Sequence, residues 1–142
     1  MLNNSAQIVK RETKALLFDQ YGTIVDMQSG LVKMVTPFLK KKSWAGNPNQ
    51  FVTWWRRKHF EDSMIDSLID QGHTPYRQIC HRAVSQVMDR GEIAYSQDEV
   101  EWLISCIEKL KPFPDVVKNL EILKNLYRLC ILSNGDRDML ET

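Results

Sequence analysis

The stretch LLFDQYGTIVD, residues 16–26, decides the fold of this 142-residue chain. It contains most of a short apolar run, KALLF at residues 14–18, which stops at Asp19 and is followed by Gly22. Such runs are typical of a strand that is buried on both faces, as in a parallel sheet. Gly22 predicts a change of chain direction after the strand. By its position alone, Asp19 is interpreted as a turn carboxylate that accepts backbone N–H bonds.

A second short apolar run, LCIL at residues 129–132, is followed directly by the polar stretch SNGD. Two such strands joined by helices are expected to be parallel, with a right-handed crossover between them. In open parallel sheets, ligands bind beyond the carboxyl ends of the strands. The sequence therefore predicts that Asp19 lies close to Ser133 and Asn134 in space.

Helical patterns fill the region between the two strands. Apolar residues recur at helical spacing between residues 31 and 39, with Pro37 inside the pattern. Residues 40–49 are expected to form a loop, and the lysines at 40–42 a solvated helix end. Further helices are predicted at residues 50–71, from Pro75 to Gly91 with Thr74 as N-cap, from the capping box at 96–99, and from Pro114 to near Asn125.

Together these patterns predict an α/β fold with a parallel, Rossmann-like core and an inserted helical cap. The expected domains are residues 1–28 as the first part of the core, 29–111 as the cap, and 112–142 as the second part of the core. Two strands with one or two helices cannot cover both faces of a parallel sheet. The core is therefore expected to be incomplete, and the chain to be an N-terminal part of a longer protein.

Composition excludes several classes of protein. The formal net charge is +1, from 19 basic and 18 acidic residues, which gives no general attraction to nucleic acid or anionic membranes. No apolar run approaches the ~20 residues that span a bilayer. The N-terminal stretch is polar and lacks the apolar core of a signal peptide, which predicts a cytoplasmic protein. The cysteines and histidines show no metal-ligand spacing, so no histidine or cysteine metal site is expected.

The polar residues at the two strand ends are compatible with covalent chemistry. Gly22 permits a tight loop whose backbone N–H groups face inward and bind an anion. Thr23 can donate a hydrogen bond to Asp19 and hold its carboxylate in one rotamer. With Ser133 and Asn134 at the second strand end, the arrangement favours a site with a carboxylate nucleophile.

Two motifs resemble those of a known family. FDQYGTIVD at residues 18–26 is similar to the first motif of the haloacid dehalogenase superfamily, and ILSNGD at 131–136 to its second. Phosphatases of the superfamily carry a second aspartate where this chain has Tyr21, and that aspartate protonates the leaving oxygen. A phenol, with an ordinary pKa of about 10, is a poor replacement, whereas a halide needs no proton. The sequence therefore most resembles the (S)-2-haloacid dehalogenase branch.

A third stretch, WWRRKHFEDS at residues 54–63, is similar to a segment on the first long cap helix of those dehalogenases. The arginine that follows the tryptophan in that segment matches Arg56, and Arg57 is the competing candidate. In the family this arginine acts on the substrate and on the departing halide. Trp54 and Trp55 are interpreted as core residues, one of which could also line an apolar substrate pocket.

The resemblance implies a mechanism. Asp19 attacks the carbon that bears the halogen, and the aspartyl ester is then hydrolysed to a 2-hydroxy acid of inverted configuration. Thr23 orients Asp19. Ser133 binds the substrate carboxylate together with backbone N–H groups near Tyr21, and Gln20 belongs to the same substrate pocket.

Asn134 and Arg56 receive the halide in this mechanism. The expected partner is a small halogenated carboxylate, with no nucleic acid and no membrane, and a homodimer is one alternative for the oligomeric state. No metal or other cofactor is implied. The family also has a lysine that pairs with the nucleophile, and no residue of this chain matches it.

Three rival interpretations stay open. The first is a magnesium-dependent phosphatase of a small metabolite. The second is hydrolysis of a different carbon–heteroatom bond through the same aspartyl ester. The third is a truncated, inactive chain that keeps the motif and acts only as a binding module.

Overall fold

The computed structural model describes residues 4–69 and 72–141. Contacts within the chain divide it into two compact units. We call residues 1–25 with 112–133 the strand unit, and residues 26–111 with 134–142 the helical unit. The second strand-end motif is therefore divided between them, because Ser133 belongs to the strand unit and Asn134 to the helical unit.

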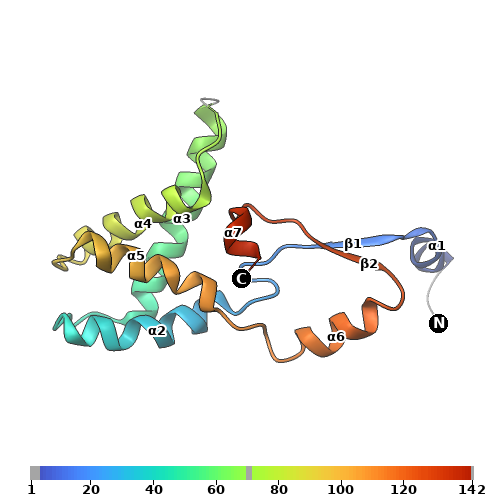
Figure 1. The fold of residues 1–142 in the computed structure, drawn as a ribbon, viewed down its shortest axis with the longest axis horizontal. Coiled ribbons are helices and arrows are strands. Elements are labelled where there is room, and N and C mark those ends of the chain that lie inside the picture. Colours follow the sequence, from blue (N-terminus) through green and yellow to red (C-terminus); the bar gives the residue numbers. More distant parts are fainter. Residues whose placement is uncertain (1–3, 70–71, 142) are drawn as a thin grey trace. The chain divides into compact units, whose positions relative to one another are not determined.

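The strand unit contains the predicted parallel pair of strands. Strand β1 (Ala15–Phe18) runs beside β2 (Arg128–Ile131), with Ala15 opposite Arg128 and Phe18 opposite Ile131 (Figure 1). Helix α1 (Asn4–Glu12) precedes β1, and helix α6 (Val116–Leu123) precedes β2. The prediction of parallel strands is confirmed, whereas α1 had no predicted counterpart.

The strands are less buried than the sequence predicts. Leu17 in β1 is 61% exposed and Ile131 in β2 is 49% exposed. Helix α6 buries none of its side chains. Within the described residues, the prediction of strands buried on both faces is therefore wrong, because two strands and two short helices supply too little apolar cover.

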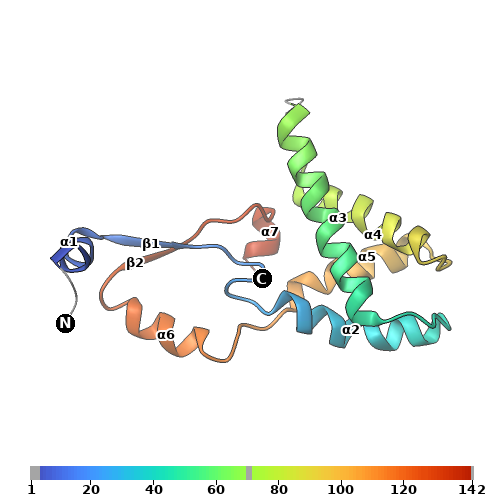
Figure 2. The same ribbon diagram turned by 180° about the vertical axis from the view of Figure 1, so that it is seen from behind.

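The helical unit is a bundle with one apolar core. Helix α3 packs against α2 and α4, and α4 packs against α5, as Figure 2 shows from behind. The largest fully buried side chains include Trp55, Phe51 and Leu31. Within the described residues, no helix is long and apolar enough to cross a membrane. The elements are α2 (Met27–Lys41), α3 (Pro48–Ile69), α4 (Tyr76–Arg90), α5 (Gln97–Ser105), the short 3₁₀ helix η1 (Ile107–Lys109) and α7 (Arg137–Leu140).

Local capping explains several helix boundaries. The carboxylate of Asp26 accepts from the backbone N of Ser29 at 2.9 Å, so α2 begins at Met27, slightly earlier than predicted. The predicted capping box is confirmed at the start of α5, where Ser96 and Glu99 bond each other's backbone N–H groups. Gly91 ends α4, also as predicted.

Two local predictions are wrong, and in both cases the side chain binds a carboxylate elsewhere in the chain. Thr74 is not the N-cap of α4, since its hydroxyl donates to the carboxylate of Asp66. Its backbone N also donates to Asp66, at 3.1 Å. Lys42 is not solvated, because its ammonium lies 2.6 Å from the carboxylate of Glu99.

Candidate functional site

The loop after β1 holds the candidate nucleophile. Asp19 is the first residue beyond Phe18, at the carboxyl end of the strand, and its side chain is exposed. The Oγ1 atom of Thr23 donates a hydrogen bond of 2.8 Å to its Oδ2 atom. Both residues lie on one tight loop, so the contact that the sequence predicts between them is present. It fixes the direction of the Asp19 carboxylate.

The same loop shows how its backbone amides are used. The N–H groups of Thr23, Ile24 and Val25 all donate to the carbonyl of Gln20, at 3.0–3.3 Å. Gly22 has a φ of +92°, in the left-handed region that favours glycine, and its N–H donates to the carbonyl of Val25 at 3.0 Å. The predicted anion cradle therefore does not include residues 22–25, because their N–H groups already have partners inside the loop.

The end of β2 lies beside the end of β1. Phe18 is opposite Ile131 in the parallel register, and the N–H of Leu132 donates to the carbonyl of Phe18 at 2.8 Å. Ser133 follows directly and is half-buried. The strand unit thus brings Asp19 and Ser133 to the carboxyl ends of the same two paired strands. This is the edge of a parallel sheet at which ligands bind.

Arg56 lies on α3 in the helical unit and is half-buried. Its Nη1 atom donates to Oε1 of Gln28, on α2, at 2.9 Å. The Nε2 atom of Gln28 donates in turn to Oδ1 of Asn49, at 2.8 Å. Sequence reasoning missed Gln28 and Asn49, because their contacts join separate helices and neither residue has a local signature. These linked hydrogen bonds through the Gln28 and Asn49 side-chain amides orient the Arg56 guanidinium from one side.

Arg57, the competing arginine, is placed differently. Its side chain is 78% exposed and its Nε atom lies 2.8 Å from the carboxylate of Glu61, one helical turn away. Such exposed pairs contribute little energy and hold the arginine on the surface. Arg57 thus pairs within its own helix, whereas Arg56 bonds a side chain of α2.

The neighbouring tryptophans have different surroundings. Trp55 is buried in the core of the helical unit, as the sequence predicts. Trp54 is only half-buried, so the interpretation of it as a core residue is wrong. It lies under the guanidinium of Arg90, whose Cζ atom is 4.2 Å from the centre of the Trp54 ring. Among the residues that the structure describes, no group of three or more His, Cys, Asp or Glu side chains could hold a metal ion.

Asn134 and the residues after it belong to the helical unit. Asp136 accepts hydrogen bonds from the backbone of α4, a contact that the sequence does not predict. The predicted site residues are thus divided into two groups. Asp19, Gln20, Tyr21, Thr23 and Ser133 belong to the strand unit, and Arg56 and Asn134 to the helical unit.

Comparison with known proteins gives consistent results. The sequence is 30% identical over 130 residues to the (S)-2-haloacid dehalogenase of Xanthobacter autotrophicus, a match that covers 90% of this chain and 47% of that protein. It is 26% identical over 129 residues to haloacetate dehalogenase H-2 of Moraxella sp. strain B, covering 90% of this chain and 54% of the relative. The chain spans about half the length of the curated relatives that it matches.

Solved structures share the fold. The crystal structure of a defluorinating L-2-haloacid dehalogenase superposes with a TM-score of 0.82 at 25% identity, over 91% of this chain and 54% of that one. The family model for haloacid dehalogenase-like hydrolases matches residues 13–142. That match includes both strand-end motifs and all the helices between them. The chain belongs to the haloacid dehalogenase-like hydrolase family.

Proposed function

We propose that this protein is a hydrolytic dehalogenase that cleaves the carbon–halogen bond of small 2-haloalkanoic acids. The observation that carries the proposal is the carboxylate of Asp19, which is fixed by Thr23 at the end of β1, beside the end of β2. The names of the two curated relatives, a 2-haloacid dehalogenase and a haloacetate dehalogenase, support the choice of substrate class.

In the proposed reaction, Asp19 is the nucleophile. Thr23 occupies Oδ2, which leaves Oδ1 to attack the carbon that bears the halogen. A carbon–oxygen bond forms as the carbon–halogen bond breaks, and the halide leaves with the bonding electron pair. Water then attacks the ester carbonyl of Asp19, which releases a 2-hydroxy acid and a proton and restores the carboxylate.

The remaining roles follow from charge and hydrogen-bonding capacity. Arg56, held by Gln28, and Asn134 receive the departing halide, because a guanidinium and an amide N–H both stabilise an anion. Ser133 binds the substrate carboxylate, and Gln20 and Tyr21 line the pocket. An anionic nucleophile and a halide leaving group need no metal, so the proposed reaction is metal-independent.

Tyr21 supports dehalogenation over phosphate ester hydrolysis. An alkoxide leaving group needs a proton, and a phenol with an ordinary pKa near 10 is a weak acid at neutral pH. A magnesium-dependent phosphatase remains the second candidate function, and a non-catalytic binding module the third. If the protein is a binding module, it keeps the sequence motif around Asp19 but shows no turnover.

Two measurements on the full chain separate these candidates. The first compares release of chloride from 2-chloropropionate with release of phosphate from an aryl phosphate in the presence of magnesium. The second uses mass spectrometry to detect an ester on the peptide that contains Asp19 after exposure to substrate. Halide release with an ester on Asp19 supports the proposal, whereas phosphate release without halide release contradicts it.

Asp19→Asn is expected to abolish both halide release and ester formation. Asp115→Asn is the matched control, because Asp115 lies in the same unit, precedes α6 and makes no side-chain capping bond there. Full activity of the Asp19→Asn variant would refute the assignment of the nucleophile. Absence of both turnover and ester from the unmodified chain would favour the binding module.

A further inference from the structure

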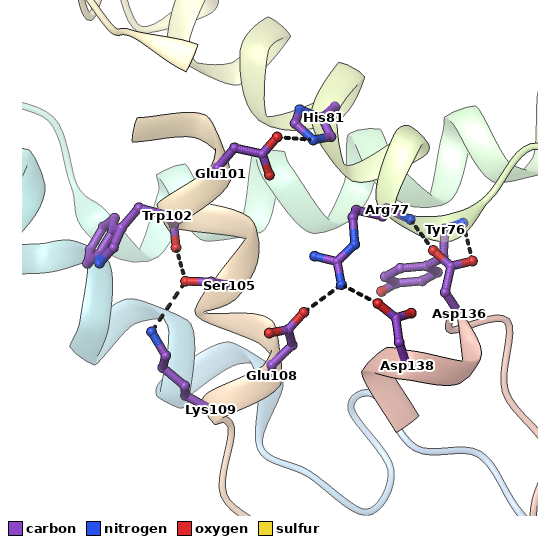
Figure 3. A network of polar contacts seen from close by, with 10 residues as sticks. All are labelled: Tyr76, Arg77, His81, Glu101, Trp102, Ser105, Glu108, Lys109, Asp136 and Asp138. Carbon is purple, nitrogen blue, oxygen red and sulfur yellow. Dashed lines mark hydrogen bonds and ion pairs between the residues drawn. The ribbon is translucent and has the colours of Figure 1, made fainter. Parts of the chain in front are cut away.

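Helix α4 is capped at its N-terminus by a residue from the other end of the chain. The Oδ1 atom of Asp136 accepts from the backbone N of Tyr76 at 3.0 Å, across 60 residues of sequence. The Oδ2 atom accepts from the backbone N of Arg77 at 2.9 Å. Figure 3 shows the carboxylate facing the first turn of the helix. One side chain therefore satisfies two consecutive helix amides.

Helix α4 has no capping side chain of its own. Pro75 occupies its N-cap position and makes no side-chain cap bond, and the first turn holds no acidic residue. Thr74 is engaged by Asp66. The first N–H groups of a helix lack partners within the helix and carry a partial positive charge. Asp136 supplies the missing acceptor, and charge-assisted bonds of this type are stronger than neutral ones.

The side chain of Arg77, whose backbone N–H is part of the first attachment, makes a second one. The Nη2 atom of Arg77 donates to Glu108 of η1 at 2.8 Å and to Asp138 of α7 at 2.9 Å (Figure 3). These hydrogen bonds, the one to Glu108 above all, raise the pKa of the Arg77 guanidinium. Met139 is buried, with 1% exposure. The segment after Asn134 is thus fastened by a carboxylate, an ion pair and an apolar side chain.

We infer that Asp136 is a positioning residue for the halide site. It fixes the segment that carries Asn134 to the helical unit, which also carries Arg56. This inference rests on the proposed function, in which these two residues receive the halide. Asp136 itself touches no reacting atom and acts through Asn134, two positions earlier in the chain.

Loss of Asp136 should weaken the stabilisation of the departing halide. Chloride is a poorer leaving group than bromide and depends more on that stabilisation. Asp136→Ala is therefore expected to lower kcat for 2-chloropropionate about 10-fold, and to lower kcat for 2-bromopropionate less. The KM values should change little. A reduced folded fraction would lower both kcat values equally, so the ratio of bromide to chloride turnover isolates the positioning effect.

Two further variants sharpen the kinetic test. In an Asn134→Ala background, Asp136→Ala should cause no additional loss, because both changes remove the same interaction. Glu141→Gln is the control, since the Glu141 side chain forms an exposed ion pair with Arg137 at 2.7 Å in the same segment. If Asp136→Ala leaves the bromide-to-chloride ratio unchanged, or adds to the loss in the Asn134→Ala background, the inference is overturned.

An independent test needs no activity. Hydrogen exchange of the Tyr76 and Arg77 amides, measured by NMR on the full chain, should accelerate in Asp136→Ala, less in Asp136→Asn and not in Glu141→Gln. Equal exchange in all four proteins overturns the capping contact and with it the inference. If the unmodified chain releases no halide but exchange responds to Asp136→Ala, the proposed function fails while the attachment of Asp136 to α4 is supported.

Discussion

The hydroxyl of Thr23 donates a 2.8 Å hydrogen bond to one oxygen of the Asp19 carboxylate. The two residues lie four positions apart on the loop that leaves β1, so the contact forms within a single turn of chain. A carboxylate held in this way keeps one oxygen in a fixed direction. A nucleophile whose attacking oxygen has a fixed direction can be held close to and aligned with the reacting carbon of a bound substrate.

Thr23→Val is expected to lower kcat for 2-chloropropionate about 10- to 100-fold, because it removes a hydrogen bond to a charged acceptor. Valine has nearly the shape of threonine, so the packing changes little. Thr23→Ser keeps the hydroxyl and should keep most of the activity. The measurement is the initial rate of chloride release, and equal rates for the Val variant and the unmodified chain would contradict the assigned role.

Arg56 and Arg57 offer a paired test within one helix turn. Arg56→Lys should lower kcat on the order of 100-fold, because lysine cannot reproduce the planar guanidinium that Gln28 orients. Arg57→Lys should change kcat less than about threefold, because Arg57 forms an exposed pair with Glu61, which a lysine can also form. Steady-state kinetics of both variants decide the assignment. The reverse pattern would move the role to Arg57.

Ser96→Ala should lower the free energy of unfolding by about 1 kcal/mol, because it removes the capping bond to the backbone of α5. Ser67→Ala is the matched control. The Ser67 hydroxyl bonds a carbonyl of its own helix, and alanine is a good helix former at such a site. Urea unfolding measures both variants. A larger loss from Ser67→Ala than from Ser96→Ala would refute the importance of the cap.

The stability of the helical unit should depend on pH through His59. Burial lowers the pKa of the His59 imidazole, against the opposing effects of a backbone hydrogen bond with Tyr76 and the charge of Asp62. The unfolded chain therefore binds a proton at a higher pH than the folded chain does. Stability is fully present above about pH 6.5 and is lost as the pH falls below that value.

The test compares urea unfolding at pH 7.5 and at pH 5.5. His59→Gln cannot be protonated in this range, so its loss of stability on acidification should be smaller than that of the unmodified chain. His73→Gln changes an exposed histidine and serves as the control. An identical pH response of the His59→Gln variant and the unmodified chain would show that His59 does not carry the effect.

Much of the fold could be predicted because its signals are local. Both strands appear as short apolar runs, and the capping box at Ser96 specifies the start of α5 through residues three positions apart. The bond between Thr23 and Asp19 was predictable for the same reason. The roles of Arg56, Ser133 and Asn134 in the reaction stay predictions.

The features that the sequence did not predict join residues far apart in the chain. Lys42 pairs with Glu99, 57 residues away in the sequence. Asp136 accepts a hydrogen bond from the first residue of α4, 60 residues away. Neither pairing leaves a pattern in its own neighbourhood. Threonine is a common N-cap residue, but the hydroxyl of Thr74 bonds the carboxylate of Asp66, which is a stronger acceptor. Local preference therefore gave the wrong cap at the start of α4.

The two connections between the strand unit and the main part of the helical unit run next to each other. Val25 and Pro112 form an antiparallel bridge, and the N–H of Asp26 donates to the carbonyl of Lys111 at 2.9 Å. The first and last residues of the segment 26–111 therefore lie next to each other. A segment with adjoining ends can lengthen, shorten or be exchanged in evolution without disturbing the register of β1 and β2. The length of this segment can therefore change while the loop after β1 keeps its place at the strand end.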